Sequence, residues 1–425
     1  MNNQIAFISE HASPLAALGG IDSGGQNVYV AETARQLSRM GFDIDIYTRW
    51  EDDSKPQVVR WQPGIRVIHV RAGKKEVIAK EQLLQHMPEF RDEMLAFMVG
   101  ERKKYLLIHA HFFMSALVAA DIKKILNIPF VVTFHALGII RRIFQGSNDA
   151  FPAERIDVEK RIVREADLII AECPQDKTDL ITHYRADRDK VAVVPCGFSC
   201  KEFYPVERSF ARKLLNIAAD EKVLLQLGRM VKRKGVDNVI RGLAHLRRNG
   251  CKCRLIIVGG EGDPDYFDTD PEIKRLKAIA AEEEVTDYIT FAGRKSRDEL
   301  KYYYSAADIF ITTPWYEPFG ITPLEAMACG TPVIGANVGG IKYSVADGVT
   351  GFLVPPNDPQ ALAKKAGVLL NDEKLMALMK KNALQRVNSI FTWRNVCDQL
   401  SDLYMNVAGS AYALKNIHYN IKKAV

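Results

Sequence analysis

The chain has 425 residues, of which 47% are apolar and 26% charged, as in soluble globular proteins, and its length predicts two or three domains. Its 58 basic and 52 acidic residues leave a net charge of +6, too small to indicate nucleic-acid binding but compatible with a cleft that binds phosphates. The longest nearly apolar stretch, residues 106–122, contains two histidines and is shorter than the roughly 20 residues of a membrane span. The first residues lack a secretion signal and the seven cysteines are scattered, so we expect a cytoplasmic protein without a transmembrane segment.

Short β-branched runs alternate with amphipathic helical windows from the start of the chain, which predicts a parallel sheet covered by helices. After the first strand and a glycine-rich loop, apolar residues recur at helical spacing from Val28 to Leu37. The predicted strands of this first unit are residues 4–9, 42–48, 65–71, 106–110, 129–134, 167–171 and 190–194. We therefore expect one doubly wound α/β domain over residues 1–200.

Residues 195–210 carry two prolines and a glycine without a clear period, which is typical of a linker. Beyond it the alternation restarts, so a second α/β domain is expected over residues 201–390. Its predicted strands are residues 222–228, 254–259, 288–293, 308–313, 332–336 and 351–355. Residues 391–425 are expected to form a helical segment that packs on the body or crosses back to the first domain. Two such domains imply a cleft, with ligands beyond the carboxyl ends of the strands.

The first candidate site is the loop GGIDSGGQNVYV, residues 19–30, between the first strand and its helix. Gly19, Gly20, Gly24 and Gly25 allow a ligand to approach the backbone, and the helix start near Gly25 favours an anion. The alternative is a flexible turn. The spacing is not G-x-G-x-x-G, so the loop does not predict a dinucleotide-dependent dehydrogenase.

The second candidate is GRMVKRKG, residues 228–235, directly after the first strand of the second unit. Arg229, Lys232, Arg233 and Lys234 could neutralise a pyrophosphate there without a metal ion. The alternative interpretation is an exposed basic turn.

The third candidate is the run from Pro314 to Gly340, which contains EPFGITPLE. We expect a helix to open near Gly320, so that the N–H groups of Phe319, Gly320 and Ile321 bind a donor phosphate. Glu317 would accept hydrogen bonds from sugar hydroxyls, and Glu325 from a ribose diol. A helix dipole alone would explain either glutamate but not the whole run.

These motifs, in this order and with TFH at residues 133–135, resemble the retaining nucleotide-sugar glycosyltransferases of family 4. The similarity covers nearly the whole chain, and the SGG-x-NVYV loop is similar to that of sucrose-phosphate synthases and D-inositol-3-phosphate glycosyltransferases. The resemblance implies the α/β fold called GT-B. In that fold two Rossmann-like domains face each other across a cleft, with an N-terminal acceptor domain, a C-terminal donor domain and a C-terminal helix that crosses back.

The resemblance also implies roles for single residues. His135 matches a histidine beside the transferred sugar, and Arg229 and Lys234 match the pair that neutralises the leaving diphosphate. Glu317 and Glu325 match glutamates that hold the donor sugar and the ribose. The other donor-site residues implied are Gly24, Gly25, Arg294 in the base-binding loop, Phe319, Gly320 and Ile321. Without the resemblance, a core histidine at a strand end is the alternative interpretation of His135.

The acceptor-site residues implied by the resemblance are Asn27, Lys80 and Arg155, the last two as contacts to an acceptor phosphate. Phe112 stands where the inositol-phosphate enzymes tend to have a tyrosine, which weakens the case for inositol phosphate. Ordinary surface cations on helices are an equally good interpretation of Lys80 and Arg155.

Three other patterns invite a metal site, and we predict none. His109 and His111 share a strand face but have no third ligand at a useful spacing, and Cys251-x-Cys253 has no second pair. The acidic run DPDYFDTD, residues 263–270, fits a surface loop better than a metal-binding D-x-D motif.

The sequence therefore predicts a retaining hexosyltransferase that takes a nucleoside diphosphate sugar, with a UDP-sugar favoured, and needs no cofactor. The partner is a small hydroxylated acceptor, with phosphorylation left open, and neither nucleic acid nor a membrane span is expected. A nucleotide-sugar epimerase stays open, as does a transferase that acts on a membrane lipid or polysaccharide precursor with peripheral membrane contact. A glycogen-type phosphorylase and an inactive sugar-nucleotide binding protein fit the motifs less well. The sequence predicts no oligomeric state.

Overall fold

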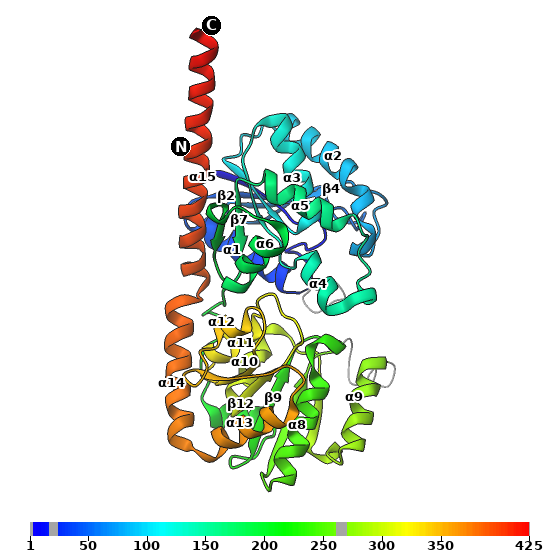
Figure 1. Cartoon of the computed structure of the whole chain (residues 1–425), viewed down its shortest axis with the longest axis vertical. Coiled ribbons are helices and arrows are strands. Elements are labelled where there is room, and N and C mark those ends of the chain that lie inside the picture. The colour runs from blue at the N-terminus through cyan, green and yellow to red at the C-terminus, as the bar shows by residue number, and fades with distance from the viewer. Residues whose placement is uncertain (1–2, 17–23, 261–269, 425) are drawn as a thin grey trace. The chain divides into compact units, whose positions relative to one another are not determined.

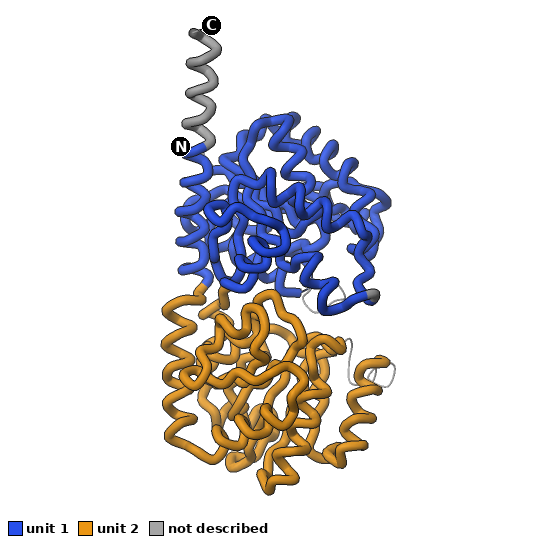
Figure 2. Tube along the Cα trace, in the orientation of Figure 1, with its two compact units in different colours: residues 1–195, 393–425 blue, residues 196–392 orange. Residues whose placement is uncertain are grey.

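The computed structural model describes residues 3–16, 24–260 and 270–424, which form two compact α/β units (Figure 1). Unit 1 comprises residues 1–195 and 393–425, and unit 2 comprises residues 196–392 (Figure 2). The last helix of the chain thus belongs to the same unit as the first strand. None of the described helices combines the length and the apolar character needed to cross a bilayer.

Unit 1 is built on an eight-stranded sheet in the order β3-β4-β2-β1-β5-β6-β7-β8. Its strands are β1 Gln4–Ile8, β2 Asp43–Arg49, β3 Val58–Gln62, β4 Ile65–Val70, β5 Leu107–His111, β6 Phe130–Thr133, β7 Leu168–Ala171 and β8 Val191–Val193. All neighbouring strands are parallel except β3 and β4. The strand β3 was not predicted from the sequence, because its side chains are at least partly exposed and include Arg60 and Gln62.

The helices of unit 1 are α1 Gly25–Arg39, α2 Met87–Gly100, α3 Phe113–Leu126, α4 Gly138–Gln145, α5 Arg155–Glu165, α6 Pro174–Tyr184 and α15 Trp393–Ala424. Helix α15 packs against α1 and β5 and buries Trp393, Leu400 and Tyr404, as the apolar face of the sequence predicted. Short 3-10 turns include η1 Lys80–Gln82 and η2 Leu84–His86.

Unit 2 is built on a six-stranded parallel sheet in the order β11-β10-β9-β12-β13-β14. Its strands are β9 Lys222–Leu227, β10 Cys253–Val258, β11 Ile289–Gly293, β12 Ile309–Thr312, β13 Val333–Ala336 and β14 Gly351–Val354. Its helices are α7 Arg208–Leu214, α8 Val236–Arg248, α9 Pro271–Glu282, α10 Arg297–Ala306, α11 Thr322–Ala328, α12 Ile341–Ser344, α13 Pro359–Asn371 and α14 Glu373–Ile390.

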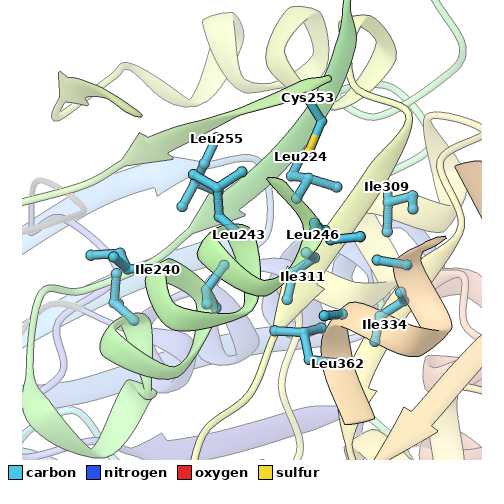
Figure 3. Close-up of a cluster of buried hydrophobic side chains, with 14 of the residues drawn as sticks. Leu224, Ile240, Leu243, Leu246, Cys253, Leu255, Ile309, Ile311, Ile334 and Leu362 are labelled. Carbon is cyan, nitrogen blue, oxygen red and sulfur yellow. The ribbon is translucent and has the colours of Figure 1, made fainter. Parts of the chain in front are cut away.

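One face of this second sheet carries a core of branched aliphatic side chains from β9, β10, β12 and β13 (Figure 3). Ile240 and Leu243 of α8 and Leu362 of α13 cover this core, and all three are at most 1% exposed. Near-complete burial of so many aliphatic side chains is the main source of stability in such a unit.

The order of the strands reverses once in each sheet, which locates the expected binding edges. In unit 1 the chain runs outward from β1 in one direction through β2 and later resumes on the other side with β5. In unit 2 it runs from β9 to β10 and β11, and then returns to β12 on the other side of β9. Ligands of open parallel sheets bind beyond the carboxyl ends of the strands at such a reversal. The loops after β1, β5, β9 and β12 are therefore where a site is expected.

Candidate active site

In unit 1, residues that follow the parallel strands β5, β6 and β7 meet at the carboxyl edge of the sheet. Phe112 follows β5, His135 lies two residues after β6, and Glu172 follows β7 directly. Phe112 has φ +84° and His135 has φ +57°, in the left-handed region that side chains larger than glycine rarely adopt. Such backbone strain persists only where the surrounding structure enforces it, and it is frequent at functional sites.

His135 is held from two sides. Its Nδ1 lies 3.0 Å from Oε1 of Glu172, and its Nε2 lies 3.2 Å from Nδ1 of His111. The two imidazole rings stack at 20° with centroids 5.4 Å apart, and the edge contact with Tyr29 has a centroid separation of 5.0 Å. Only 9% of the His135 side chain is exposed. The predicted sugar-site histidine is thus a fixed, largely buried group.

The two strand histidines behind it are structural. Burial lowers the pKa of His109 to about 3 and lowers that of His111 well below its usual value, and neighbouring histidines add to both shifts. His109 contacts the hydroxyls of Tyr404 and Thr133, so it ties α15 to the sheet. Within residues 3–16, 24–260 and 270–424, no three His, Cys, Asp or Glu side chains are placed to bind a metal ion. The D-x-D run lies almost wholly outside the described residues, at 263–269.

The start of α1 is stabilised by side chains of the predicted loop motif. Gly24 is the N-cap, Gly25 begins the helix, and the Gly24 N–H donates to Oδ1 of Asn27 at 2.9 Å. Nδ2 of Asn27 donates to the Ser13 carbonyl at 3.0 Å, and the residue is 3% exposed. The buried Asn27 side chain therefore stabilises the loop through hydrogen bonds to its backbone. Gly19 and Gly20 lie outside the described residues.

Arg155 is 1% exposed, so the interpretation of this residue as a surface cation is wrong. Its Nε donates to the buried carboxylate of Glu159 at 2.7 Å, and its Nη2 donates to the carbonyl of Ala136. Aromatic rings of Phe112, Phe113 and Phe151 surround its guanidinium at 4.5–4.9 Å. Because Ala136 and Gly138 follow His135 and Gly138 donates to Glu159, this cluster fixes the loop that carries the histidine.

Lys80 differs from Arg155, since 21% of its side chain is exposed at the first residue of η1. Its Nζ lies 3.9 Å from a carboxylate oxygen of Glu81. A direct contact with a phosphate through Lys80 stays a prediction, and this lysine has the accessibility for it.

In unit 2 the loops after β9 and β12 are joined at the strand reversal. The Trp315 N–H donates to the Arg233 carbonyl at 2.9 Å, and Nη1 of Arg233 donates to the Tyr316 carbonyl at 3.3 Å. Gly235 has φ +64°, and a Cβ there would lie 2.1 Å from the Thr313 carbonyl oxygen. Only glycine permits this approach of the two loops.

Glu317 and Lys234 form an ion pair across these loops, and Nη1 of Arg233 lies 3.6 Å from the same carboxylate oxygen. Burial alone would raise the pKa of Glu317, but the charges of Lys234, Arg233 and Arg229 outweigh it and leave that pKa lowered. Burial lowers the pKa of Lys234, and the Glu317 charge opposes this shift. Arg229 is exposed. Three cations thus surround one carboxylate.

The helix after Glu317 begins later than predicted. Helix α11 starts at Thr322, so Phe319, Gly320 and Ile321 lie in the preceding loop and do not form the first helical turn. Gly320 has φ +86°, which is incompatible with a right-handed helix, and the Ile321 carbonyl accepts the first helical N–H groups. Phe319 is 2% exposed.

Glu325 lies inside α11 at 3% exposure and has partners on both oxygens. Nη1 of Arg297 is 3.1 Å from Oε1, and the Tyr304 hydroxyl donates to Oε2 at 3.0 Å. Burial raises the pKa of Glu325, although Arg297 and Tyr304 oppose the shift. Arg294 is exposed in the loop between β11 and α10, three residues before Arg297.

Sequence reasoning missed the partners of these residues. Glu172 could have been found, because it follows a predicted strand at the edge where ligands bind. Arg297 and Tyr304 precede Glu325 by more than twenty residues on another helix, and no local pattern links them. Among the predicted site residues, Lys234 and Glu317 are in contact with each other in unit 2, whereas His135 and Lys80 belong to unit 1.

The chain matches known proteins over nearly its whole length. Residues 23–202 match Glycosyltransferase Family 4, and residues 207–386 match Glycosyl transferases group 1. A D-inositol 3-phosphate glycosyltransferase from Corynebacterium glutamicum is 35% identical over 409 residues, which cover 94% of this chain and 96% of the relative. A sucrose-phosphate synthase structure from Thermosynechococcus elongatus has a TM-score of 0.87 and 34% identity, and the match covers 96% of this chain and 100% of that one.

The Anabaena protein HepE, solved in complex with UDP, has a TM-score of 0.75 at 22% identity over 95% of this chain and 100% of its own, and it supports the fold alone. The residues of the cation cluster, with Glu317 and Glu325, lie inside the second matched region, residues 207–386. With the two parallel-sheet units, these matches show that the chain belongs to the glycosyltransferases of family 4, as a glycosyltransferase with the GT-B fold that uses a nucleotide-sugar donor.

Proposed function

We propose that this chain transfers a hexosyl group from a UDP-sugar to a small hydroxylated acceptor that carries a phosphate, with retention of the anomeric configuration. The observation that carries the proposal is the cluster of Arg229, Arg233 and Lys234 around Glu317 after β9 and β12. Three positive charges and one negative charge leave about two charges for a leaving diphosphate. Preorganised charges of this kind contribute more than any other effect to the acceleration of many group transfers.

In the proposed reaction the bond between the anomeric carbon and the β-phosphate oxygen breaks with its electrons on the oxygen. The acceptor hydroxyl forms the new bond on the same face of the sugar, and its proton passes to the leaving phosphate. Arg229 and Lys234 stabilise the charge on the diphosphate. Glu317 holds the sugar hydroxyls and Glu325 the ribose, while His135 lies beside the sugar. No metal ion or cofactor is part of this scheme.

UDP is favoured as the nucleotide because the fold is shared with a protein solved with UDP, and a screen decides the point. Thermal unfolding with UDP, GDP and ADP should show a shift with UDP alone, since a ligand at 100 times its Kd adds about 2.7 kcal/mol. A larger shift with GDP or ADP would overturn the UDP assignment.

A phosphorylated acceptor is supported by the printed names of two relatives, a D-inositol 3-phosphate glycosyltransferase and a sucrose-phosphate synthase. The accessible Lys80 supplies a cation for the phosphate. Lys80→Ala should raise the acceptor KM and leave the donor KM unchanged, and added salt should have the same selective effect. An acceptor KM that does not move would remove Lys80 from the site.

The decisive assay supplies UDP-glucose with D-inositol 3-phosphate or a hexose phosphate, each beside its dephosphorylated form. NMR of the product then gives the anomeric configuration. An α-linked product from the α-linked donor, formed only with the phosphate ester, is the expected result. A β-linked product would contradict retention, equal use of the dephosphorylated acceptor would contradict the phosphate, and donor conversion without acceptor would indicate an epimerase.

We also infer a cytoplasmic location. The seven cysteines, all within the described part of the chain, form no disulfide bonds with one another, which fits a reducing compartment.

A further inference from the structure

The surroundings of His135 contain more carboxyl groups than the proposed chemistry uses. Glu172 is 4% exposed and contacts Nδ1 of His135 at 3.0 Å. Asp176, in the first turn of α6, accepts a hydrogen bond from the Glu172 backbone N–H at 3.1 Å. The presence of two carboxyl groups this close to a buried imidazole calls for an explanation, because burying an unpaired charge costs free energy.

The pattern of donors and acceptors restricts the protonation of His135. An ionised carboxylate can only accept a hydrogen bond, so Nδ1 of His135 must carry a proton that points at Glu172. Nε2 then either accepts from Nδ1–H of His111 or, in the doubly protonated imidazole, donates to it. Burial holds His111 neutral by lowering its pKa, which leaves one proton shared between the two rings. Nδ1 of His135 is protonated in both arrangements.

Asp176 is the protonated member of this carboxyl pair. Burial and the nearby Glu172 charge raise the pKa of Asp176 to about 8, so Asp176 is largely protonated at neutral pH. The other groups around the ring are Tyr29 from α1 and His111 from β5 with His109 behind it, whereas Cys173 interacts with Glu172 and Asp179 with Asp176. Among these described neighbours, Glu172 is the group whose carboxylate lies on the imidazole itself.

We propose that Glu172 is the positioning residue of His135: it fixes the orientation of the ring and keeps the proton on Nδ1, while Nε2 stays paired with Nδ1 of His111. This inference rests on the proposed function only for the place of the ring beside the transferred sugar. The ring orientation and the protonated Nδ1 follow from the contacts within unit 1.

Two readouts test the proposal on the full chain. The first is the pair of ¹⁵N chemical shifts of His135 without substrate, assigned by their absence in His135→Gln. The protein should show a protonated Nδ1 between pH 6 and 8, and Glu172→Gln should show a mixture of tautomers, because an amide can accept or donate. The matched control is Asp179→Asn, which removes a carboxylate from helix α6, seven residues after Glu172 in the sequence.

The second readout is kinetic. Glu172→Gln should lower kcat by about 10- to 100-fold with little change in the donor KM, by analogy with the loss found when a carboxylate that orients a metal-binding imidazole is removed. Glu172→Gln keeps the shape of the side chain, so it carries the test if Glu172→Ala fails to fold. Asp179→Asn should retain both the tautomer and kcat.

A wild-type spectrum with the proton on Nε2 and none on Nδ1 would overturn the inference, as would a Glu172→Gln variant with unchanged shifts and unchanged kcat. The two hypotheses fail separately. If no variant transfers sugar but Glu172→Gln still changes the Nδ1-protonated form into a mixture of tautomers, the positioning role of Glu172 is supported and the proposed function is wrong.

Discussion

The two units place charged residues at the same kind of sheet edge but use them differently. In unit 1 the ionisable groups at this edge are buried in pairs, as in Arg155 with Glu159 and His135 with Glu172. In unit 2 the cations after β9 are half-buried or exposed, and they outnumber the carboxylate they surround. The comparison teaches that unit 1 uses charge to hold a loop in a strained conformation, whereas unit 2 holds an excess of positive charge ready for a ligand. Removal of the buried Arg155 charge should therefore affect folding, whereas removal of a unit 2 cation should affect affinity or turnover.

Arg155→Met breaks the unit 1 side of this comparison most severely. It leaves the Glu159 carboxylate buried without its cation, which should cost about 3–5 kcal/mol of unfolding free energy in urea titrations. Arg164→Met, on the exposed face of the same helix, is the control and should change little. Adding Glu159→Gln to Arg155→Met should recover most of the loss. An unfolding curve unchanged by Arg155→Met would mean that Arg155 serves a ligand and not the fold.

Lys234→Ala tests the unit 2 side. We expect kcat to fall by about 10²- to 10³-fold in initial-rate assays of UDP release, as when one charge-stabilising donor is removed from a transition state. The unfolding midpoint should change far less than for Arg155→Met. Lys232→Ala, an exposed lysine in the same turn, is the matched control and should retain activity. Equal losses in both variants would indicate a general field effect.

Glu325→Gln and Glu317→Gln sharpen the comparison within unit 2. If Glu325 binds the ribose, its loss should weaken UDP by about 10-fold or more, the value of one hydrogen bond to a charged group. Glu317→Gln should leave UDP affinity nearly intact and lower the turnover of the sugar nucleotide. Calorimetric titration with UDP separates them, and matching losses of UDP affinity would refute this division of roles.

Asp176→Asn has an expected effect that depends on pH. The pKa of Asp176 is raised to about 8 in the folded chain, against about 3.9 when unfolded. Between these values the folded chain holds a proton that the unfolded chain has lost, so stability falls as pH rises from about 4 to 8. The amide of the Asp176→Asn variant does not titrate, so the variant should not show this loss of stability with rising pH.

The melting temperature of Asp176→Asn relative to the unmodified chain should therefore increase from pH 5 to pH 8 and then level off. About 2–4 °C corresponds to 1 kcal/mol for a unit of this size. A difference that is constant with pH would show that the carboxyl titrates normally.

The sequence predicted the parallel strands of both sheets well, because each is a continuous apolar run and burial on both faces produces that pattern. It missed β3, whose partly exposed side chains lack such a run. It placed the start of α11 too early, because the left-handed backbone conformation of Gly320 cannot be deduced from the residue type alone. Partnerships such as Glu325 with Arg297 depend on the packing of distant helices, which local spacing does not encode.

Helix α15 belongs to unit 1 although it follows unit 2 in the sequence, and this order has a consequence for biosynthesis. Unit 2 is one continuous segment, residues 196–392, inserted into unit 1, whose last helix is translated only afterwards. Until that helix emerges from the ribosome, His109 lacks the Tyr404 hydroxyl and the surface of α1 lacks its cover. Because domains tend to fold as they are synthesised, the middle of the chain can mature before its beginning does. A premature stop near residue 390 would thus spare the half that was made second and leave the half that was made first unfinished.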